Sequence, residues 1–149
     1  MSADRLGIGF VGSGFNARFH IQSLVAVREI DVRGVYSPNE KNAASSAALA
    51  RELDVGEARP YKSIRDMVAD PAINAVWLCG PNHARISNIE EIVGAIKSGA
   101  GTLRGIACEK PLARNVAEAK RVADLARSVG LSTGYLENQL FSQIGRAHV

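Results

Sequence analysis

Residues 6–17 read LGIGFVGSGFNA, a short apolar run followed by the pattern Gly-x-Gly-x-x-Ala. The run at 6–11 is typical of a buried strand, and the residues after the pattern predict a helix over 17–27. Where this pattern joins a strand to a helix, the first glycine allows a tight turn and the second lets the backbone approach a pyrophosphate. Unpaired N–H groups and the positive end of the helix dipole then bind the phosphates. We therefore expect a dinucleotide to be held at Gly12, Ser13, Gly14, Phe15 and Asn16.

Short apolar runs alternate with longer amphipathic segments along the rest of the chain, as in repeated βαβ units. Strands are expected at residues 30–36, 58–61, 75–79, 105–108 and 131–135, and helices at 40–53, 63–69, 86–97 and 115–129. We predict an α/β fold, a doubly wound parallel Rossmann sheet of six strands with helices on both faces. Residues 1–143 are expected to form this one nucleotide-binding domain.

The 149-residue chain is 46% hydrophobic and 22% charged, which suits one globular domain and excludes disordered classes. It has no apolar run long enough to span a bilayer, and we expect neither a secretory leader nor membrane contact. The net charge of +3 is spread along the chain, which argues against a nucleic-acid surface. Two cysteines are too few for a disulfide framework, so a reduced, cytoplasmic chain is expected.

The last residues, 144–149, read IGRAHV, which one reading frame of a common short-read sequencing adapter encodes. A natural polar tail is the alternative, but it would have to match every codon by chance. We interpret residues 144–149 as adapter-derived and the reading frame as cut short.

The end of the second predicted strand bears on the choice of cofactor. The glycine pattern is usually followed, about 20 residues on, by an Asp or Glu that holds the ribose diol of NAD. Here residues 36–39 read YSPN and contain no carboxylate. A 2′-phosphate is therefore not repelled, and Ser37, Asn39 or Lys41 are expected to bind it, which favours NADP over NAD. In the alternative interpretation Lys41 is an ordinary solvated helix residue.

Two further loops are expected at the carboxyl ends of the fourth and fifth strands, where an open α/β sheet binds its ligand. They are CGPNH at 79–83 and CEKP at 108–111. A buried lysine beside a carboxylate is an efficient acid or base, because burial eases its deprotonation and the carboxylate orients it. We therefore expect Lys110 and Glu109 to be catalytic.

Three motifs, taken in this order, resemble the Gfo/Idh/MocA family, the group of glucose–fructose oxidoreductase and inositol dehydrogenase. They are Gly12-x-Gly14-x-x-Ala17, Gly80-Pro81-Asn82-His83 and Glu109-Lys110-Pro111-Leu112, and the resemblance covers residues 5–143. It implies a Rossmann domain that binds NAD or NADP. In such enzymes the loop at 80–83 lies beside the nicotinamide, and the motif lysine reaches the nicotinamide and the substrate hydroxyl. The resemblance thus adds Gly80, Pro81, Asn82, His83, Glu109 and Lys110 to the expected cofactor contacts.

The resemblance implies an NAD(P)-dependent oxidoreductase acting on a sugar, a polyol or a related small alcohol. In this family a second α/β domain carries the substrate-binding residues, and we expect it to be missing from this chain. We therefore expect this chain to be an inactive, truncated part of a homo-oligomeric enzyme whose small-molecule substrate binds with the missing domain. One departure is Arg85, because the family often has a histidine there.

Other functions use a similar first turn. A non-enzymatic dinucleotide sensor or scaffold is the main alternative, although it would give the Glu-Lys-Pro motif no required role. An S-adenosylmethionine-dependent methyltransferase usually has an acid at the end of the second strand, which is absent. A short-chain dehydrogenase is disfavoured because neither Tyr36 nor Tyr135 is followed four residues later by Lys.

Four more residues have structural interpretations that we weigh against functional ones. We expect His20 to be a packed or surface residue of its helix and Trp77 to belong to the core. Cys79 and Cys108 end neighbouring strands and would approach each other, yet strand cysteines are mostly small buried hydrophobes. No Cys-x-x-Cys or His-Glu-x-x-His spacing occurs, so no metal site is expected.

Overall fold

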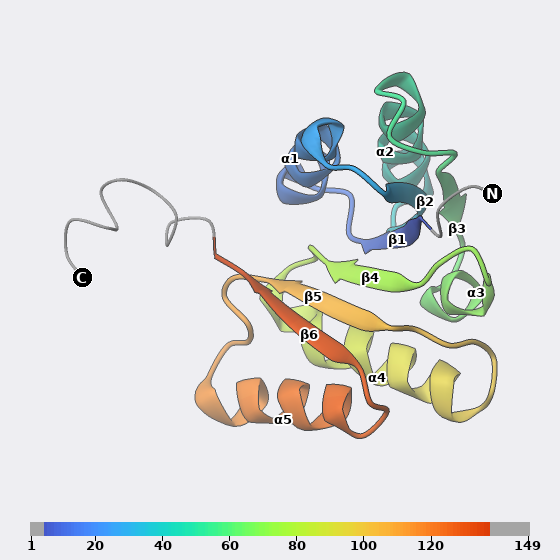
Figure 1. The fold of residues 1–149 in the computed structure, drawn as a ribbon. Coiled ribbons are helices and arrows are strands. Elements are labelled where there is room, and N and C mark those ends of the chain that lie inside the picture. Colours follow the sequence, from blue (N-terminus) through green and yellow to red (C-terminus); the bar gives the residue numbers. More distant parts are fainter. Residues whose placement is uncertain (1–4, 138–149) are drawn as a thin grey trace.

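Six parallel strands form one sheet in the order β3-β2-β1-β4-β5-β6 (Figure 1). This computed structural model describes residues 5–137, so the tail at 144–149 lies outside the described residues. The strands are β1 (Leu6–Val11), β2 (Ile30–Tyr36), β3 (Arg59–Tyr61), β4 (Ala75–Leu78), β5 (Gly105–Glu109) and β6 (Ser132–Leu136). The strand order reverses between β1 and β4, and a crevice therefore opens at the carboxyl ends of these two strands.

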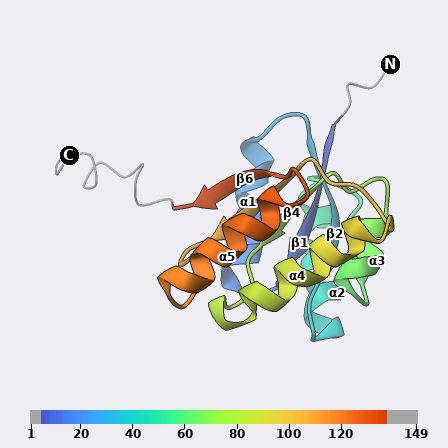
Figure 2. The same ribbon diagram turned by 90° about the horizontal axis from the view of Figure 1, so that it is seen from below.

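Helices cover both faces of the sheet (Figures 1 and 2). Two of them pack on one face, α1 (Phe15–Ser23) and α2 (Glu40–Glu52). The other face carries α3 (Ile64–Ala69), α4 (Arg85–Lys97) and α5 (Val116–Arg127). The predicted doubly wound parallel fold is confirmed.

The core is divided between the two faces because side chains alternate along each strand. On one side, Ile8 and Phe10 of β1 pack against the alanines of α2, which let that helix approach closely. On the other side, Val76 and Leu78 of β4 pack against α4. Among residues 5–137, no helix is both long and apolar enough to cross a membrane.

Predicted boundaries agree with the structure to within two residues, except that the first helix was predicted to reach residue 27 and ends at Ser23, where the 3-10 turn Leu24–Ala26 follows it. Helix α1 begins at Phe15, earlier than predicted, because the extended Gly14 forms its N-cap. The helix after β5 begins only after Asn115, whose side chain caps it by accepting a hydrogen bond from the Glu118 amide at 2.9 Å. Trp77 is half-buried and not a full core residue, because no helix of the described residues covers β5 and β6 on its face (Figure 1).

Candidate functional site

The turn after β1 is packed directly against the loop after β4. Gly12 has a φ of +115°, which side-chain-bearing residues rarely adopt. A Cβ at this position would lie 2.7 Å from the amide nitrogen of Gly80 and 2.9 Å from the carbonyl carbon of Cys79. The Gly12 amide donates to the carbonyl oxygen of Tyr36 at 2.8 Å, which ties the turn to the end of β2 as well. Glycine is therefore required here by both conformation and space.

The start of α1 leaves backbone donors available for an anion. Gly14 is the N-cap, and no side chain caps the first N–H groups of this helix. A Cβ at Gly14 would have no protein atom within 4 Å, so the missing side chain leaves open space and not a packed contact. This combination of free N–H groups, dipole and open space suits a phosphate group.

The end of β2 contributes hydroxyl groups and no carboxylate. The Ser13 hydroxyl donates to the Ser37 hydroxyl at 2.9 Å, which joins the glycine turn to the end of β2. The Asn39 side chain is already used, because its Oδ1 accepts a hydrogen bond from the Asn42 amide at 3.1 Å and so caps α2. Lys41 is exposed in the first turn of α2. Of the three predicted 2′-phosphate ligands, Ser37 is therefore the one that is hydrogen-bonded to the glycine turn.

A cleft of about 290 Å³ lies between the glycine turn, the end of β2 and the loop after β4. It brings together part of the predicted cofactor site, namely Gly12, Ser13, Gly14, Ser37, Gly80, Pro81 and His83. Asn88 of α4 also lines it, and the sequence analysis missed this residue. A single amide on an amphipathic helix gives no signal in one sequence, because such residues usually face solvent.

The remaining predicted ligands lie beside this cleft and do not line it. Phe15 and Asn16 form the first turn of α1, and Phe15 is 81% exposed. Asn82 lies in the short 3-10 turn Asn82–Ala84 that precedes α4. Phe15 and Asn82 are thus direct neighbours in the chain of residues that line the cleft, Gly14 and Pro81.

Glu109 is buried at the end of β5 and forms its closest contact with α1. Its Oε1 lies 2.5 Å from Nε2 of His20, and the side chains are 9% and 18% exposed respectively. The ring of His20 also packs edge-on against Trp77, with centroids 5.0 Å apart. His20 is therefore a packed residue, as expected, but it also links the helix of the glycine turn to the strand that carries the Glu-Lys-Pro motif.

Lys110 lies in a different environment from the one predicted. It is exposed, because β5 ends at Glu109 and Lys110 is the first residue beyond the sheet. Glu109 contacts it through the backbone, since Oε2 accepts a hydrogen bond from the Lys110 amide at 3.1 Å. The carboxylate therefore fixes the course of the loop, while the ammonium is free of hydrogen bonds and ion pairs to residues 5–137. The following Lys110–Pro111 peptide bond is cis.

The two cysteines lie on opposite faces of the sheet. In the pairing of β4 with β5, Leu78 is opposite Cys108. Cys79, one residue further on, therefore packs with the core of α1 and α2, while Cys108 packs with that of α4. Both are free thiols, and loss of hydration raises the pKa of Cys79 to about 12 and also raises the pKa of Cys108. Both thiols are thus poorly ionised, which suits a structural role.

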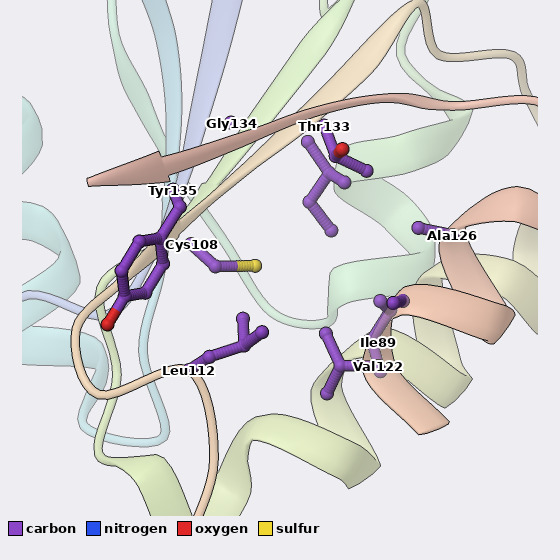
Figure 3. Close-up of a pocket in the computed structure, with 10 residues that line it drawn as sticks. Ile89, Cys108, Leu112, Val122, Ala126, Thr133, Gly134 and Tyr135 are labelled. Atoms are coloured by element: carbon purple, nitrogen blue, oxygen red, sulfur yellow. The ribbon is translucent and has the colours of Figure 1, made fainter. Parts of the chain in front are cut away.

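A second hollow of about 120 Å³ lies beneath β6, between the sheet and the helices α4 and α5 (Figure 3). The Cys108 thiol points into it, and Tyr135 and Leu112 stand at one side. Its other lining side chains are almost all apolar, including Ile89, Ile106 and Val122.

Within residues 5–137 no group of three or more His, Cys, Asp or Glu side chains gathers in a metal-binding arrangement.

Known proteins with similar sequences include dehydrogenases of inositol and of levoglucosan. A family model described as an oxidoreductase family with an NAD-binding Rossmann fold matches residues 6–135. Inositol 2-dehydrogenase of Gluconacetobacter diazotrophicus is 32% identical over 126 residues, which are 82% of this chain and 34% of the relative. Levoglucosan dehydrogenase of Pseudarthrobacter phenanthrenivorans is 30% identical over 129 residues, 82% of this chain and 30% of the relative. The chain thus spans about a third of the length of the curated relatives it matches.

Solved structures with the same fold include enzymes determined with a bound dinucleotide. GenD2 from gentamicin A biosynthesis, in complex with NAD, superposes with a TM-score of 0.78 at 24% identity. The match covers 99% of this chain and 39% of GenD2. Myo-inositol dehydrogenase from Lactobacillus casei, in complex with NAD(H) and myo-inositol, has a TM-score of 0.75 at 24% identity, over 96% of this chain and 40% of that enzyme. These likenesses confirm the architecture.

Proposed function

Because the chain belongs to the Gfo/Idh/MocA oxidoreductase family, we propose that it is the cofactor-binding part of an NAD(P)-dependent oxidoreductase. Its substrate would be a sugar, a polyol or a related small alcohol. This substrate class is supported by relatives that act on such compounds, among them inositol 2-dehydrogenase and levoglucosan dehydrogenase. We also propose that the protein is cytoplasmic, which is supported by its low cysteine content. We propose further that the whole enzyme is a homo-oligomer.

One observation carries the proposal: the glycine turn opens into a cleft at the point where the strand order reverses. Gly14 offers uncapped N–H groups and open space, as a diphosphate requires. The hydroxyls of Ser13 and Ser37 line the same cleft, whose walls are otherwise mostly backbone and apolar groups. The residues present therefore fit a dinucleotide.

The roles of the motif residues follow from their places at the carboxyl edge of the sheet. When bound, the nicotinamide supplies a hydride-accepting carbon. Lys110 would exchange the substrate hydroxyl proton at its Nζ, and its exposure is consistent with a group that meets a ligand at the edge. Glu109 would hold the loop in place through the Lys110 amide. Substituting Lys110 with Ala in a full-length enzyme is then expected to lower kcat far more than cofactor affinity.

We extend the proposal to a preference for NADP. The end of β2 presents the Ser37 hydroxyl where NAD enzymes of this fold usually present a carboxylate. The nearest acid, Glu40, lies in the first turn of α2. A 2′-phosphate at this position would meet the Ser37 hydroxyl and the start of α2, with no carboxylate at residues 36–39.

A titration tests the proposal on this chain. The single tryptophan, Trp77, lies one residue before Leu78 at the end of β4, so its fluorescence is expected to report binding in the cleft. NADPH, NADH and S-adenosylmethionine are each titrated against the emission. The expected result is saturable binding of both dinucleotides, tighter for NADPH, and none of S-adenosylmethionine. Binding of S-adenosylmethionine alone would overturn the oxidoreductase assignment.

A further inference from the structure

Arg85, the first residue of α4, is among the largest fully buried side chains of the protein. It is 2% exposed and directly follows the turn Asn82–Ala84. A guanidinium is permanently charged, and arginine is almost never fully buried unless it is paired. Among residues 5–137, however, no carboxylate lies within ion-pair distance of it. Burial of a charge without a counter-charge lowers the free energy of unfolding, so we expect specific hydrogen bonds to stabilise the buried guanidinium.

These hydrogen bonds are with the backbone on both sides of Cys79. Arg85 Nη1 donates to the carbonyl oxygen of Leu78 at 2.5 Å, and Nη2 donates to that of Gly80 at 3.2 Å. Its Nε has no hydrogen-bond partner in the described part of the chain. The guanidinium thus donates two hydrogen bonds, one to Leu78 at the end of β4 and one to Gly80 in the loop that follows this strand.

The bracketed segment is also held from the other side. The Cys79 amide donates to the carbonyl oxygen of Val11 at 2.8 Å, and the Gly80 backbone lies against Gly12. Residues 78–80 are therefore fixed between the glycine turn and Arg85. Any shift of this segment would change the width of the cleft, because Gly80 and Pro81 form one of its walls.

We propose that Arg85 is a positioning residue for the dinucleotide: it sets the loop at 78–81 against the glycine turn and so fixes the width of the cleft. The inference rests on the proposed function for its ligand. A planar guanidinium offers two donor nitrogens at a fixed separation, whereas the ammonium of lysine carries all its N–H groups on one nitrogen. Lysine is therefore expected to replace Arg85 only in part.

The test compares Arg85→Met and Arg85→Lys with Ile92→Ala. Ile92 is a fully buried residue of the same helix that does not line the cleft, so Ile92→Ala lowers stability without touching the loop. The first readout needs no ligand: hydrogen exchange at the Cys79 amide is expected to rise about tenfold or more in Arg85→Met and less in Arg85→Lys, relative to Ile92→Ala.

The second readout is the Kd for NADPH, measured at a temperature where each variant is folded. Arg85→Met is expected to bind about tenfold more weakly, Arg85→Lys to fall between it and the wild type, and Ile92→Ala to bind normally. If the Kd and the exchange rate changed equally in Arg85→Met and Ile92→Ala, Arg85 would contribute only to packing, and the inference would be overturned. Should Arg85→Met not fold, the same comparison is decided with Arg85→Lys. Should the wild type bind no dinucleotide, the proposed function fails, while the exchange measurement still decides the role of Arg85.

Discussion

The cleft beside the glycine turn and the cavity beneath β6 are built on the same sheet but differ in the polar groups that line them. The cleft, of about 290 Å³, is lined by the glycine turn, the hydroxyls of Ser13 and Ser37 and the amide of Asn88. The cavity, of about 120 Å³, is lined almost wholly by apolar side chains such as Ile106 and Val122 (Figure 3). The cleft therefore offers more groups that can recognise a polar ligand than the cavity does.

The difference arises from the topology of the sheet. The cleft lies where β1 and β4 send their chains to opposite faces, so no helix closes it. The cavity lies at the edge, where Thr133 and Gly134 of β6 are too small to fill the space above α5. The cavity exists because small side chains leave space in the core, so it affects stability. The cleft exists because the chain leaves β1 and β4 toward opposite faces, and such a crevice can hold a ligand.

The largest expected effect is that of Gly12→Ala in the cleft. A Cβ 2.7 Å from the Gly80 nitrogen, at a φ of +115°, must push the two loops apart. We expect the Kd for NADPH to rise about 100-fold, equivalent to about 2.7 kcal/mol, measured by calorimetry. The matched control is Gly94→Ala in α4, where a Cβ meets nothing within 4 Å. That variant is expected to gain about 0.5–1 kcal/mol of stability with unchanged affinity, because alanine favours a helix over glycine.

The next effect concerns the choice between the two cofactors. Ser37→Asp places a carboxylate at the end of β2, where it would repel a 2′-phosphate and accept hydrogen bonds from a ribose diol. The ratio of the Kd values for NADPH and NADH is expected to shift about tenfold or more toward NADH, equivalent to about 1.4 kcal/mol. Ser132→Asp adds the same charge at an exposed position of β6 and should leave the ratio unchanged. If the ratio of the two Kd values did not change in Ser37→Asp, the end of β2 would not contact the cofactor.

A smaller effect, on stability alone, is expected in the apolar cavity. Ile106 is 4% exposed and lines this hollow, so Ile106→Val enlarges a space that nothing fills. The free energy of unfolding, measured with urea, is expected to fall by about 1 kcal/mol. The Kd for NADPH should stay within about twofold of the wild type, because the cavity and the cleft are separate. A larger loss of affinity would show that the two hollows are coupled.

The smallest effect is a pH dependence that arises at Tyr61 of β3, a residue that lines neither the cleft nor the cavity. Burial is the main cause that raises the pKa of Tyr61 above its ordinary 10.0, and its hydrogen bond to Asp70 adds to this. The neutral phenol is therefore favoured in the folded state. Its contribution to stability is complete below pH 10.0 and is lost as the pH rises through the raised value.

The same contact acts on Asp70 in acid. The hydrogen bond from Tyr61 is the main cause that lowers the pKa of Asp70 below its ordinary 3.8. This contribution is present above pH 3.8 and is lost as the pH falls through the lowered value. Thermal unfolding of Tyr61→Phe should show a weaker pH dependence at both extremes, and its affinity for NADPH should equal that of the wild type. A pH dependence as strong as that of the wild type would show that other groups cause it.

The sequence alone determined the order of strands and helices and the position of the glycine turn. These features depend on local signals, namely the alternation of apolar residues, the capping side chains and the glycines, and they act between neighbours in the chain. The absence of a carboxylate at residues 36–39, after β2, is a feature of the same kind, because it follows from counting along one βαβ unit.

Only the tertiary structure decided which side chains meet. Glu109 pairs with His20, 89 positions away, and not with the ammonium of its neighbour Lys110. Cys79 and Cys108 end adjacent strands yet lie on opposite faces, because the register places Leu78 beside Cys108. Such contacts depend on strand register, side-chain direction and the packing of helices against the sheet. Spacing along the chain encodes none of these, since they arise only when distant segments pack together.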